Sequence, residues 1–286
     1  MSKLLDYANV GKTYVIAEMS ANHAGSLDTA LEIVEAAKEA GADCLKIQTY
    51  TADTMTLDCD GQPFRITDGG LWDGRVLHEL YEEASLPWEW QPAIKEACEK
   101  AGIDFLSTPF DATAVDFLEE LGCDAYKIAS FELVDIPLIE YAASKGKPMI
   151  ISCGMGTIED IERALDACEK AGNDKAVLLK CCSEYPANWV DMHLSNIIDM
   201  EKRFKVPVGL SDHSMGDLAA LIGVSMGAVA VETHFCLSRK IKNPDSEFSM
   251  EPSEFAEMVT RIREVEQIKG DVRYGPTDRE LSSMRF

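Results

Sequence analysis

Short apolar runs alternate with longer segments of helical period along this chain, and they do so eight times. Each run is rich in Val, Ile, Leu or Phe, which is typical of a parallel strand that is buried on both faces. The pattern predicts strands over residues 14–19, 43–48, 103–108, 124–130, 148–153, 176–182, 207–212 and 228–235.

The segments between these runs carry their apolar residues on one helical face. In LDTALEIVEAAKEAG, Leu27, Leu31 and Val34 share a face, and Gly41 ends the helix. The segment TIEDIERALDACEKAG repeats this design, with Thr157 as the expected N-cap. Similar turns (EAGAD, KAGID, KAGND and SMGAV) precede later strands. Such recurrence is what a repeated strand–helix unit leaves in a sequence.

Alternating strands and helices indicate an α/β fold with a parallel sheet and right-handed crossovers. Eight units in a chain of this length favour a closed barrel, and the G-x-G-x-x-G fingerprint of a dinucleotide fold is absent. We therefore predict a single (β/α)8 TIM barrel over residues 1–270. The segment from Tyr50 to about Trp88 predicts a long insertion after the second strand, and residues 271–286 are polar with no core pattern.

Composition narrows the class of protein. The 286 residues are 46% hydrophobic and 27% charged, no apolar run reaches the length of a membrane span, and the N-terminus has no apolar signal core, so we expect a cytoplasmic protein that does not bind membranes. The net charge of −23 and the lack of a basic stripe argue against nucleic-acid binding. Nine Cys without a C-x-x-C pair predict neither a disulfide framework nor a structural zinc site.

The predicted strands have apolar bodies and polar C-terminal ends. Because buried polar groups are costly unless matched, and because barrel enzymes act at this rim, the pattern predicts a ligand site without naming a reaction. The polar residues at or just beyond these ends include Glu18, Lys46, Gln48, Thr108, Lys127, Ser130, Glu132, Ser152, Ser183, Tyr185, Ser211, His213 and His234.

Two histidines close neighbouring predicted strands. Parallel neighbours lie about 4.8 Å apart, so His213 and His234 can share one metal ion, with acids such as Glu232 and Asp245 available nearby. The alternative is a pair of structural histidines that are held by hydrogen bonds.

Two lysines interrupt apolar strands and should point into the mouth of the barrel. Lys46 and Lys127 can serve as a Schiff-base amine, as phosphate and carboxylate ligands, or as members of a structural Lys–Glu network. The hydroxyls around them favour anion recognition, since several small donors beside two cations suit an oxyanion-rich ligand. The cysteines Cys153, Cys181 and Cys182 have no His beside them in sequence, so we do not expect a thiol nucleophile.

These residues resemble, in order and spacing, the catalytic domain of the sialic acid synthase family. The matching segments are IAEMSANHAGSLDTALEIVEAAKEAGAD, LKIQTYTADTMT, LSTPFD, YKIASFEL, ISCGMGTIEDIE, GLSDHS, ETHFCLSR and PDSEFSMEPSEF, and they cover nearly the whole chain from Tyr14 to Pro276. The insertion, TYTADTMTLD followed by GLWDGRVLHELYEEASLPW, is most similar to the pseudaminic acid synthase branch of that family.

The resemblance implies a reaction in which phosphoenolpyruvate, an N-acylated amino-sugar aldehyde and water give a nonulosonic acid and phosphate. It implies that His213 and His234 hold Mn²⁺, with Mg²⁺ or Co²⁺ as alternatives, and that the ion polarises the aldehyde. The matching phosphoenolpyruvate positions are Lys46, Thr108, Lys127, Ser130, Ser152, Ser183 and Ser211. The sugar positions include Gln48, Tyr185 and Asp245.

The resemblance also suggests catalytic roles for Lys127, Glu132 and Glu18, with Glu132 as the first candidate to handle the proton of the attacking water and Glu18 as the second. It implies a homodimer. Residues 271–286 would be a linker stub towards an antifreeze-like domain, which in the family covers the partner's active site and which we expect this chain to lack. Two rivals remain: a Schiff-base aldolase or lyase on a barrel, and a non-catalytic sugar-binding barrel.

Overall fold

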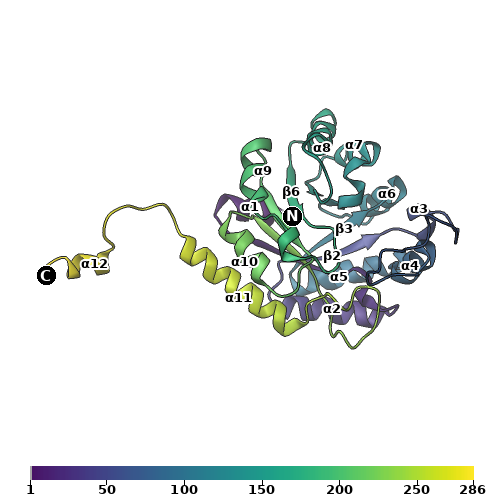
Figure 1. Ribbon diagram of the computed structural model, residues 1–286, viewed down its shortest axis with the longest axis horizontal. Helices are drawn as coiled ribbons and strands as arrows, with labels where there is room; N and C mark the ends of the chain where they lie inside the picture. Colours follow the sequence, from purple (N-terminus) through teal and green to yellow (C-terminus); the bar gives the residue numbers. More distant parts are fainter. Residues whose placement is uncertain (1) are drawn as a thin grey trace.

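The computed structural model describes residues 2–286 and forms a closed barrel of parallel strands wrapped by helices (Figure 1). Neighbouring strands pair in chain order, and the last strand pairs with the first. The strands are β1 (Tyr14–Glu18), β2 (Cys44–Thr49), β3 (Asp104–Pro109), β4 (Tyr126–Ile128), β5 (Met149–Ser152), β6 (Ala176–Cys181), β7 (Val208–Asp212) and β8 (Ala230–His234). The predicted barrel is confirmed, and strand ends deviate only by the ordinary scatter of element boundaries.

Most of the helices pack outside the strands, and the last one lies in the exposed C-terminal segment. They are α1 (Ser2–Asn9), α2 (Leu27–Glu39), α3 (Ala52–Met55), α4 (Leu77–Ala84), α5 (Gln91–Ala101), α6 (Ala112–Glu120), α7 (Ile136–Ala143), α8 (Ile158–Lys170), α9 (Asn196–Phe204), α10 (Leu218–Ser225), α11 (Pro252–Lys269) and α12 (Asp278–Ser283). Short 3-10 helices lie at η1 (Ser20–His23), η2 (Trp88–Trp90), η3 (Ser130–Val134) and η4 (Trp189–Asp191). The expected N-cap of α8 is present, since the Thr157 hydroxyl accepts from the Asp160 amide at 3.2 Å.

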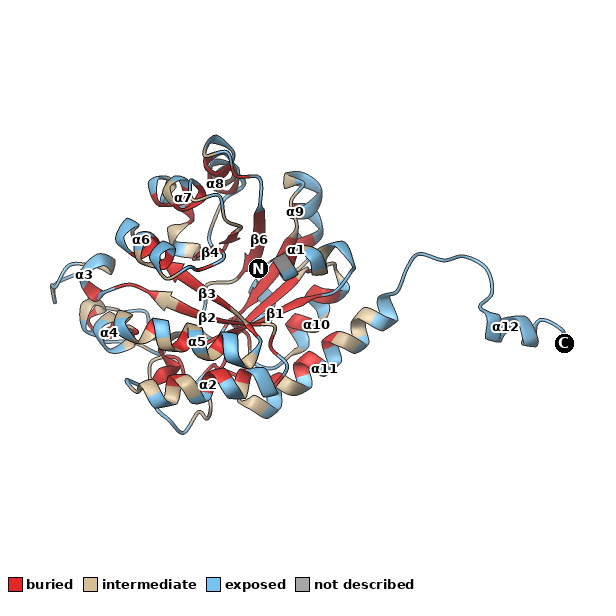
Figure 2. Ribbon diagram, turned by 180° about the vertical axis from the view of Figure 1, so that it is seen from behind, coloured by how far each residue is buried: buried red, intermediate tan, exposed pale blue. Residues whose placement is uncertain are grey.

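Two apolar cores follow from strand alternation. Side chains on the outer face of the strands pack against the helices, and those on the inner face fill the barrel below the mouth. The strands are almost wholly buried, whereas the helices combine buried and exposed residues (Figure 2). The inner core includes Tyr14, Leu106 and Leu179, and α1 adds the fully buried Leu4. Because Lys3 of α1 pairs with Asp104 at the start of β3, at 3.3 Å, this helix covers the N-terminal end of the barrel. Its core role was not predicted.

The predicted insertion after β2 is present, and it is more ordered than a plain loop. It contains α3, α4 and η2, and a bridge between Arg65 and Val76 folds residues 64–77 back on themselves. The Phe64 carbonyl accepts from the Leu77 amide at 2.9 Å, which closes the turn. The insertion is therefore a structured unit beside the barrel mouth.

The segment after α11 leaves the barrel. Residues 271–286 are exposed throughout, including α12, which the sequence pattern did not predict (Figures 1 and 2). The interpretation of this segment as a linker stays a prediction. None of the helices in residues 2–286 combines the length and the apolar character that crossing a membrane requires. All nine cysteines, which lie within this range, are free.

We expect Leu4→Ala to lower the free energy of unfolding by about 2–4 kcal/mol, because it leaves a cavity under the inner core. Urea unfolding followed by circular dichroism measures this change. Val10→Ala is the matched control, since Val10 follows the same helix but is 67% exposed, and its effect should stay within about 0.5 kcal/mol. Equal effects of the two substitutions would contradict a core role for α1.

Candidate active site

The C-terminal ends of the strands converge on one pocket. It is lined by Glu18, Lys46, Gln48, Thr108, Phe110, Lys127, Ala129, Ser130, Ser152, Cys181, Tyr185, Ser211, His213, Glu232 and His234. Strand alternation explains the selection on β2, where Lys46 and Gln48 face inward while Thr49 faces out and hydrogen-bonds Gln91 at 2.9 Å. Most of the predicted site residues therefore share one cavity, as the rim pattern indicated.

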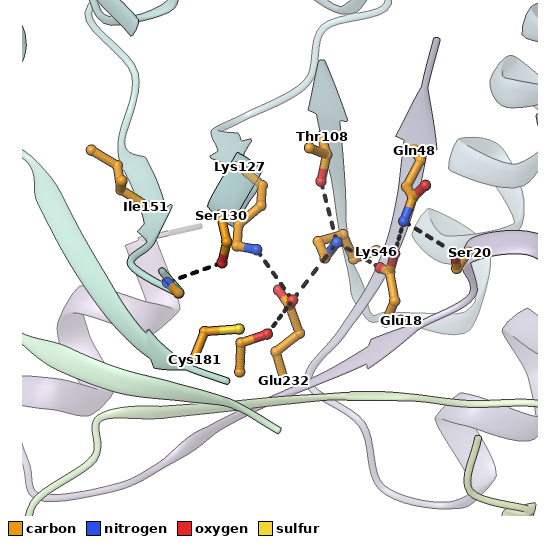
Figure 3. Close-up of polar contacts among 12 residues, drawn as sticks. Glu18, Ser20, Lys46, Gln48, Thr108, Lys127, Ser130, Ile151, Cys181 and Glu232 are labelled. Atoms are coloured by element: carbon orange, nitrogen blue, oxygen red, sulfur yellow. Dashed lines mark hydrogen bonds and ion pairs between the residues drawn. The ribbon is translucent and has the colours of Figure 1, made fainter. Parts of the chain in front are cut away.

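Four buried charged side chains form the floor of the pocket (Figure 3). Lys46 Nζ lies 2.7 Å from Glu18 Oε2 and donates to Thr108 Oγ1 at 3.2 Å. Lys127 Nζ lies 3.2 Å from Glu232 Oε1, and Lys46 Nζ lies 3.8 Å from the same oxygen. The two lysines and two carboxylates therefore alternate across the barrel as one network.

Glu232 lies at the centre of this network. Burial opposes its charge, but Lys127 and Lys46 lower the pKa of the Glu232 carboxyl to about 2. Ser211 donates to Glu232 Oε1 at 3.1 Å, whereas Glu232 Oε2 has no hydrogen-bond partner within residues 2–286. The sequence suggested Glu232 only as an acid near the histidines. Its position two residues before His234 on one strand was the available signal, because both side chains then face inward.

Small hydroxyl groups lie beside the lysines. Ser130 Oγ accepts from the Gly154 amide at 3.1 Å, and a Cβ at Gly154 would lie 2.8 Å from this oxygen and 2.3 Å from Ser183 Oγ. Ser183, although not part of the pocket lining, is thus next to Ser130. Ser152 Oγ is buried with no hydrogen-bond partner in the described chain. A buried unpaired hydroxyl next to two ammonium groups is typical of a site that awaits an anionic ligand.

The two predicted metal-binding histidines lie side by side, with ring centroids 5.4 Å apart. His213 Nδ1 is 2.9 Å from the Cys182 carbonyl oxygen. A carbonyl only accepts, so Nδ1 carries the proton and Nε2 of the neutral ring keeps its lone pair. His234 Nδ1 is buried without a hydrogen-bond partner in residues 2–286, and burial together with His213 and the two lysines holds the pKa of His234 well below its usual range.

Neutral imidazoles with free lone pairs are what a divalent cation requires, and His234 meets this condition. Burial opposes a charged His213 ring, but Cys181 raises the pKa of His213, so a bound cation would have to displace the Nε2 proton of this ring. With that proton displaced, the pair fits a metal. Asp245 Oδ2 lies 4.0 Å from His234 Nδ1. The described residues contain no group of three or more His, Cys, Asp or Glu that could hold an ion. Two imidazoles would leave the remaining coordination positions to substrate and water, as catalytic sites need.

The predicted sugar-side residues surround this histidine pair. The Tyr185 ring lies 4.2 Å from that of His213, and the buried Asp245 accepts from the Ala21 amide at 3.1 Å. Gln48 donates to Glu18 Oε1 at 2.8 Å and to Ser20 at 3.0 Å (Figure 3). The pocket thus has a lysine and hydroxyl side and an imidazole and aromatic side.

The chain is similar to known proteins. The NeuB family model matches residues 33–274. The chain belongs to the NeuB family. It is 44% identical to the pseudaminic acid synthase of Campylobacter jejuni over 275 residues, which cover 96% of this chain and 80% of the relative. It is 40% identical to the pseudaminic acid synthase of Helicobacter pylori, with 95% and 80% coverage.

A solved structure agrees with these relatives. The N-acetylneuraminic acid synthetase of Leptospira borgpetersenii, crystallised with citrate, superposes with a TM-score of 0.85 at 31% identity and covers 96% of this chain and 90% of the other. The resemblance to sialic acid synthases and to their pseudaminic acid branch is confirmed, as is the prediction that this NeuB chain is an enzyme of the synthase class.

One cysteine of this NeuB chain has a spatial partner that the sequence did not reveal. Cys181 Sγ lies 3.8 Å from His213 Nδ1. Burial opposes ionisation, but His213 lowers the pKa of the Cys181 thiol to about 7. The contact joins residues of β6 and of the loop after β7, so adjacency in sequence could not reveal it.

Glu132 lies apart from the floor network, on η3 after β4. Burial raises the pKa of its carboxyl to about 7, and Lys127 opposes this shift only in part. Glu132 Oε2 has no hydrogen-bond partner among the described residues. Glu132 is not among the residues that line the pocket, although it follows Ser130, which is, by two positions. A carboxyl that titrates near neutrality is suited to accept and return a proton.

The Glu132 shift predicts a pH-dependent stability difference. The folded state holds this proton up to about pH 7, whereas the unfolded carboxyl loses it near 4.5. The wild type therefore loses stability relative to Glu132→Gln as pH rises from about 4.5 to 7, by about 1–3 kcal/mol in total. Urea unfolding at pH 4, 6 and 8 measures the difference. Glu120→Gln, at an exposed site, is the control, and a parallel offset for both variants would rule out the shifted carboxyl.

Proposed function

We propose that this chain condenses phosphoenolpyruvate with an N-acylated amino-sugar aldehyde and water to give a nonulosonic acid and phosphate, and that the product is of the pseudaminic acid type. Membership of the NeuB family and the named synthases among its relatives support this reaction. The homodimer implied by the resemblance is part of the proposal.

The observation that carries the proposal is the lysine and hydroxyl side of the pocket. Lys46 and Lys127 are buried beside Thr108, Ser130 and Ser152 in a chain whose net charge is −23. A small dianion or trianion such as phosphoenolpyruvate matches these donors. The carboxylates of the network compensate the lysines until such a ligand supplies its own negative charge.

The metal proposed for this site is Mn²⁺, with Mg²⁺ or Co²⁺ as alternatives. His213 and His234 would hold it, and when bound it supplies a Lewis acid for the aldehyde oxygen of the sugar. Tyr185 and Asp245 lie next to the histidine pair, and Gln48 lines the same pocket, so these three residues are the candidates to orient the sugar.

Different side chains of the pocket then serve different steps of the proposed reaction. The lysines and hydroxyls fix phosphoenolpyruvate so that its methylene carbon faces the aldehyde carbon, and a carbon–carbon bond forms between them. Carbon–carbon bond formation leaves a cation at C2 and an alkoxide on the former aldehyde carbon. Water adds to C2 and loses a proton, for which Glu132 is the first candidate acceptor and Glu18 the second, and this proton passes on to the alkoxide. The C2–oxygen bond to phosphate then breaks while the new hydroxyl becomes the C2 carbonyl and its proton leaves with the phosphate, whose charge Lys127 balances.

The ion pairs weigh against the Schiff-base rival. That chemistry needs a neutral lysine amine. Burial opposes the ammonium form, yet Glu18 and Glu232 raise the pKa of Lys46, while Lys127 lies 3.2 Å from the ionised Glu232. Both lysines are therefore better suited to bind an anion than to attack a carbonyl.

We expect the chain to release inorganic phosphate from phosphoenolpyruvate only when Mn²⁺ and an acylated amino sugar, such as a diacetamido-trideoxy-altrose, are both present. Chelation with EDTA should abolish release, and His213→Ala should reduce it at least about 1000-fold. His193→Ala, an exposed histidine, should retain wild-type activity. Undiminished turnover after chelation, or a borohydride-trapped pyruvate adduct, would favour the aldolase rival. Ligand binding without turnover for every sugar would favour the non-catalytic rival.

Gly154→Ala tests the anion pocket separately. Its added methyl would collide with Ser183 Oγ and Ser130 Oγ, so we expect the KM for phosphoenolpyruvate to rise at least about tenfold. Steady-state kinetics at saturating sugar measure this change. Gly61→Ala is the control, because its methyl would meet only Cys59 Sγ at an ordinary 3.7 Å. An unchanged KM would argue that the hydroxyls do not hold this substrate.

A further inference from the structure

The insertion after β2 and the loop after β8 are joined near the barrel mouth. Trp72 of the insertion donates its indole N–H to the Pro244 carbonyl oxygen at 2.9 Å. The two residues are 172 positions apart in the chain. No sequence pattern marks this contact, and the proposed reaction gives it no role.

Ring contacts reinforce the hydrogen bond. The Trp72 ring lies 5.6 Å from that of Tyr185 and 6.3 Å from that of Phe248, and the last two rings are 5.3 Å apart. Phe248 in turn lies 4.8 Å from His234. Three segments, following β2, β6 and β8, thus meet in one aromatic cluster whose inner members touch the histidine pair.

The loop after β8 carries Asp245 directly after the bonded Pro244. The Asp245 carboxylate accepts from the Ala21 amide of η1, and within the loop the Asp245 carbonyl accepts from the Ser249 hydroxyl at 2.7 Å. The backbone of residues 243–249 therefore determines where the Asp245 carboxylate lies. The hydrogen bond from Trp72 to the Pro244 carbonyl connects that backbone to the insertion.

The turn that carries Trp72 is held by hydrogen bonds and an ion pair. The Ile66 carbonyl accepts from the Gly74 amide at 2.9 Å, and the Asp73 carboxylate accepts from the Gly69 amide at 3.1 Å. Arg75 pairs with Glu83 of α4 at 2.5 Å. A side chain held on an ordered turn can position what it touches, because its own freedom is already restricted.

We propose that Trp72 is a positioning residue for the sugar side of the site. Its contacts with the Asp245 loop and with the Tyr185 ring hold both in place beside His213 and His234. This inference rests on the proposed function. It gives the insertion a role of its own, because the contacts of Trp72 with Tyr185, Phe248 and Pro244 lie on the sugar half of the pocket.

The decisive comparison is between Trp72→Ala, Trp72→Phe and the control Trp189→Ala, a tryptophan that is 63% exposed on η4. Loss of one hydrogen bond and two ring contacts should raise the sugar KM about tenfold in Trp72→Ala, while the KM for phosphoenolpyruvate stays within about twofold. Trp72→Phe keeps a ring but loses the N–H bond, so its sugar KM should be intermediate. The control should match the wild type.

Hydrogen–deuterium exchange on the same proteins does not depend on turnover. In Trp72→Ala, amides of residues 240–250 should exchange faster than in the wild type and the control, while the strands should not change. Unchanged exchange in that loop would contradict the inference that Trp72 holds the loop in place. Faster exchange with an unaltered sugar KM, or an equal rise in both KM values, would overturn the positioning role. Failure of the proposed function is a different result: no phosphate release by the wild type itself.

Discussion

The buried network of Lys46, Glu18, Glu232 and Lys127 is the constraint around which the rest of the molecule is arranged. Burying four charges costs more than their mutual attraction returns, unless geometry is good and every remaining polar atom is satisfied. Here Glu232 Oε2 stays unpaired among the residues that the structure describes. The network therefore contributes little to the stability of the barrel. It does hold two ammonium groups at the pocket in a strongly acidic chain.

Apolar packing below the mouth of the barrel offsets the free-energy cost of burying these charges. The inner core is fully buried from Leu4 of α1 up to Leu179, and the outer core packs the strands against the helices along their length. Stability and chemistry are thus separated along the barrel axis, with apolar packing at the N-terminal end and polar groups at the C-terminal end. A rigid wall holds the lysines close to the carboxylates, and this closeness keeps Glu232 ionised in spite of its burial.

The sequence predicted what depends on local pattern. Buried strands are apolar and their ends are polar, so the barrel and most of the pocket lining could be predicted residue by residue. Contacts between distant segments leave no such periodicity. The pairing of Glu232 with both lysines, the Cys181–His213 approach and the Trp72–Pro244 bond each depend on tertiary geometry. The exposed helix α12 and the core role of α1 were missed because short helices carry too few residues for a clear period.

The two halves of the pocket lie close together, yet their electrostatic requirements differ. In the proposed reaction the lysine side binds an anion, and it offers two ammonium groups whose charge Glu18 and Glu232 balance until the anion arrives. The histidine side must keep lone pairs available, and the same lysines help to do this, because their charge disfavours protonation of His234. Under the proposed function, one pair of cations would thus serve both substrates: it would bind the anion directly and help to keep the His234 imidazole neutral for a metal. The aromatic cluster around Tyr185 and Phe248 adds to this effect, since apolar rings beside His234 further oppose a charged imidazole.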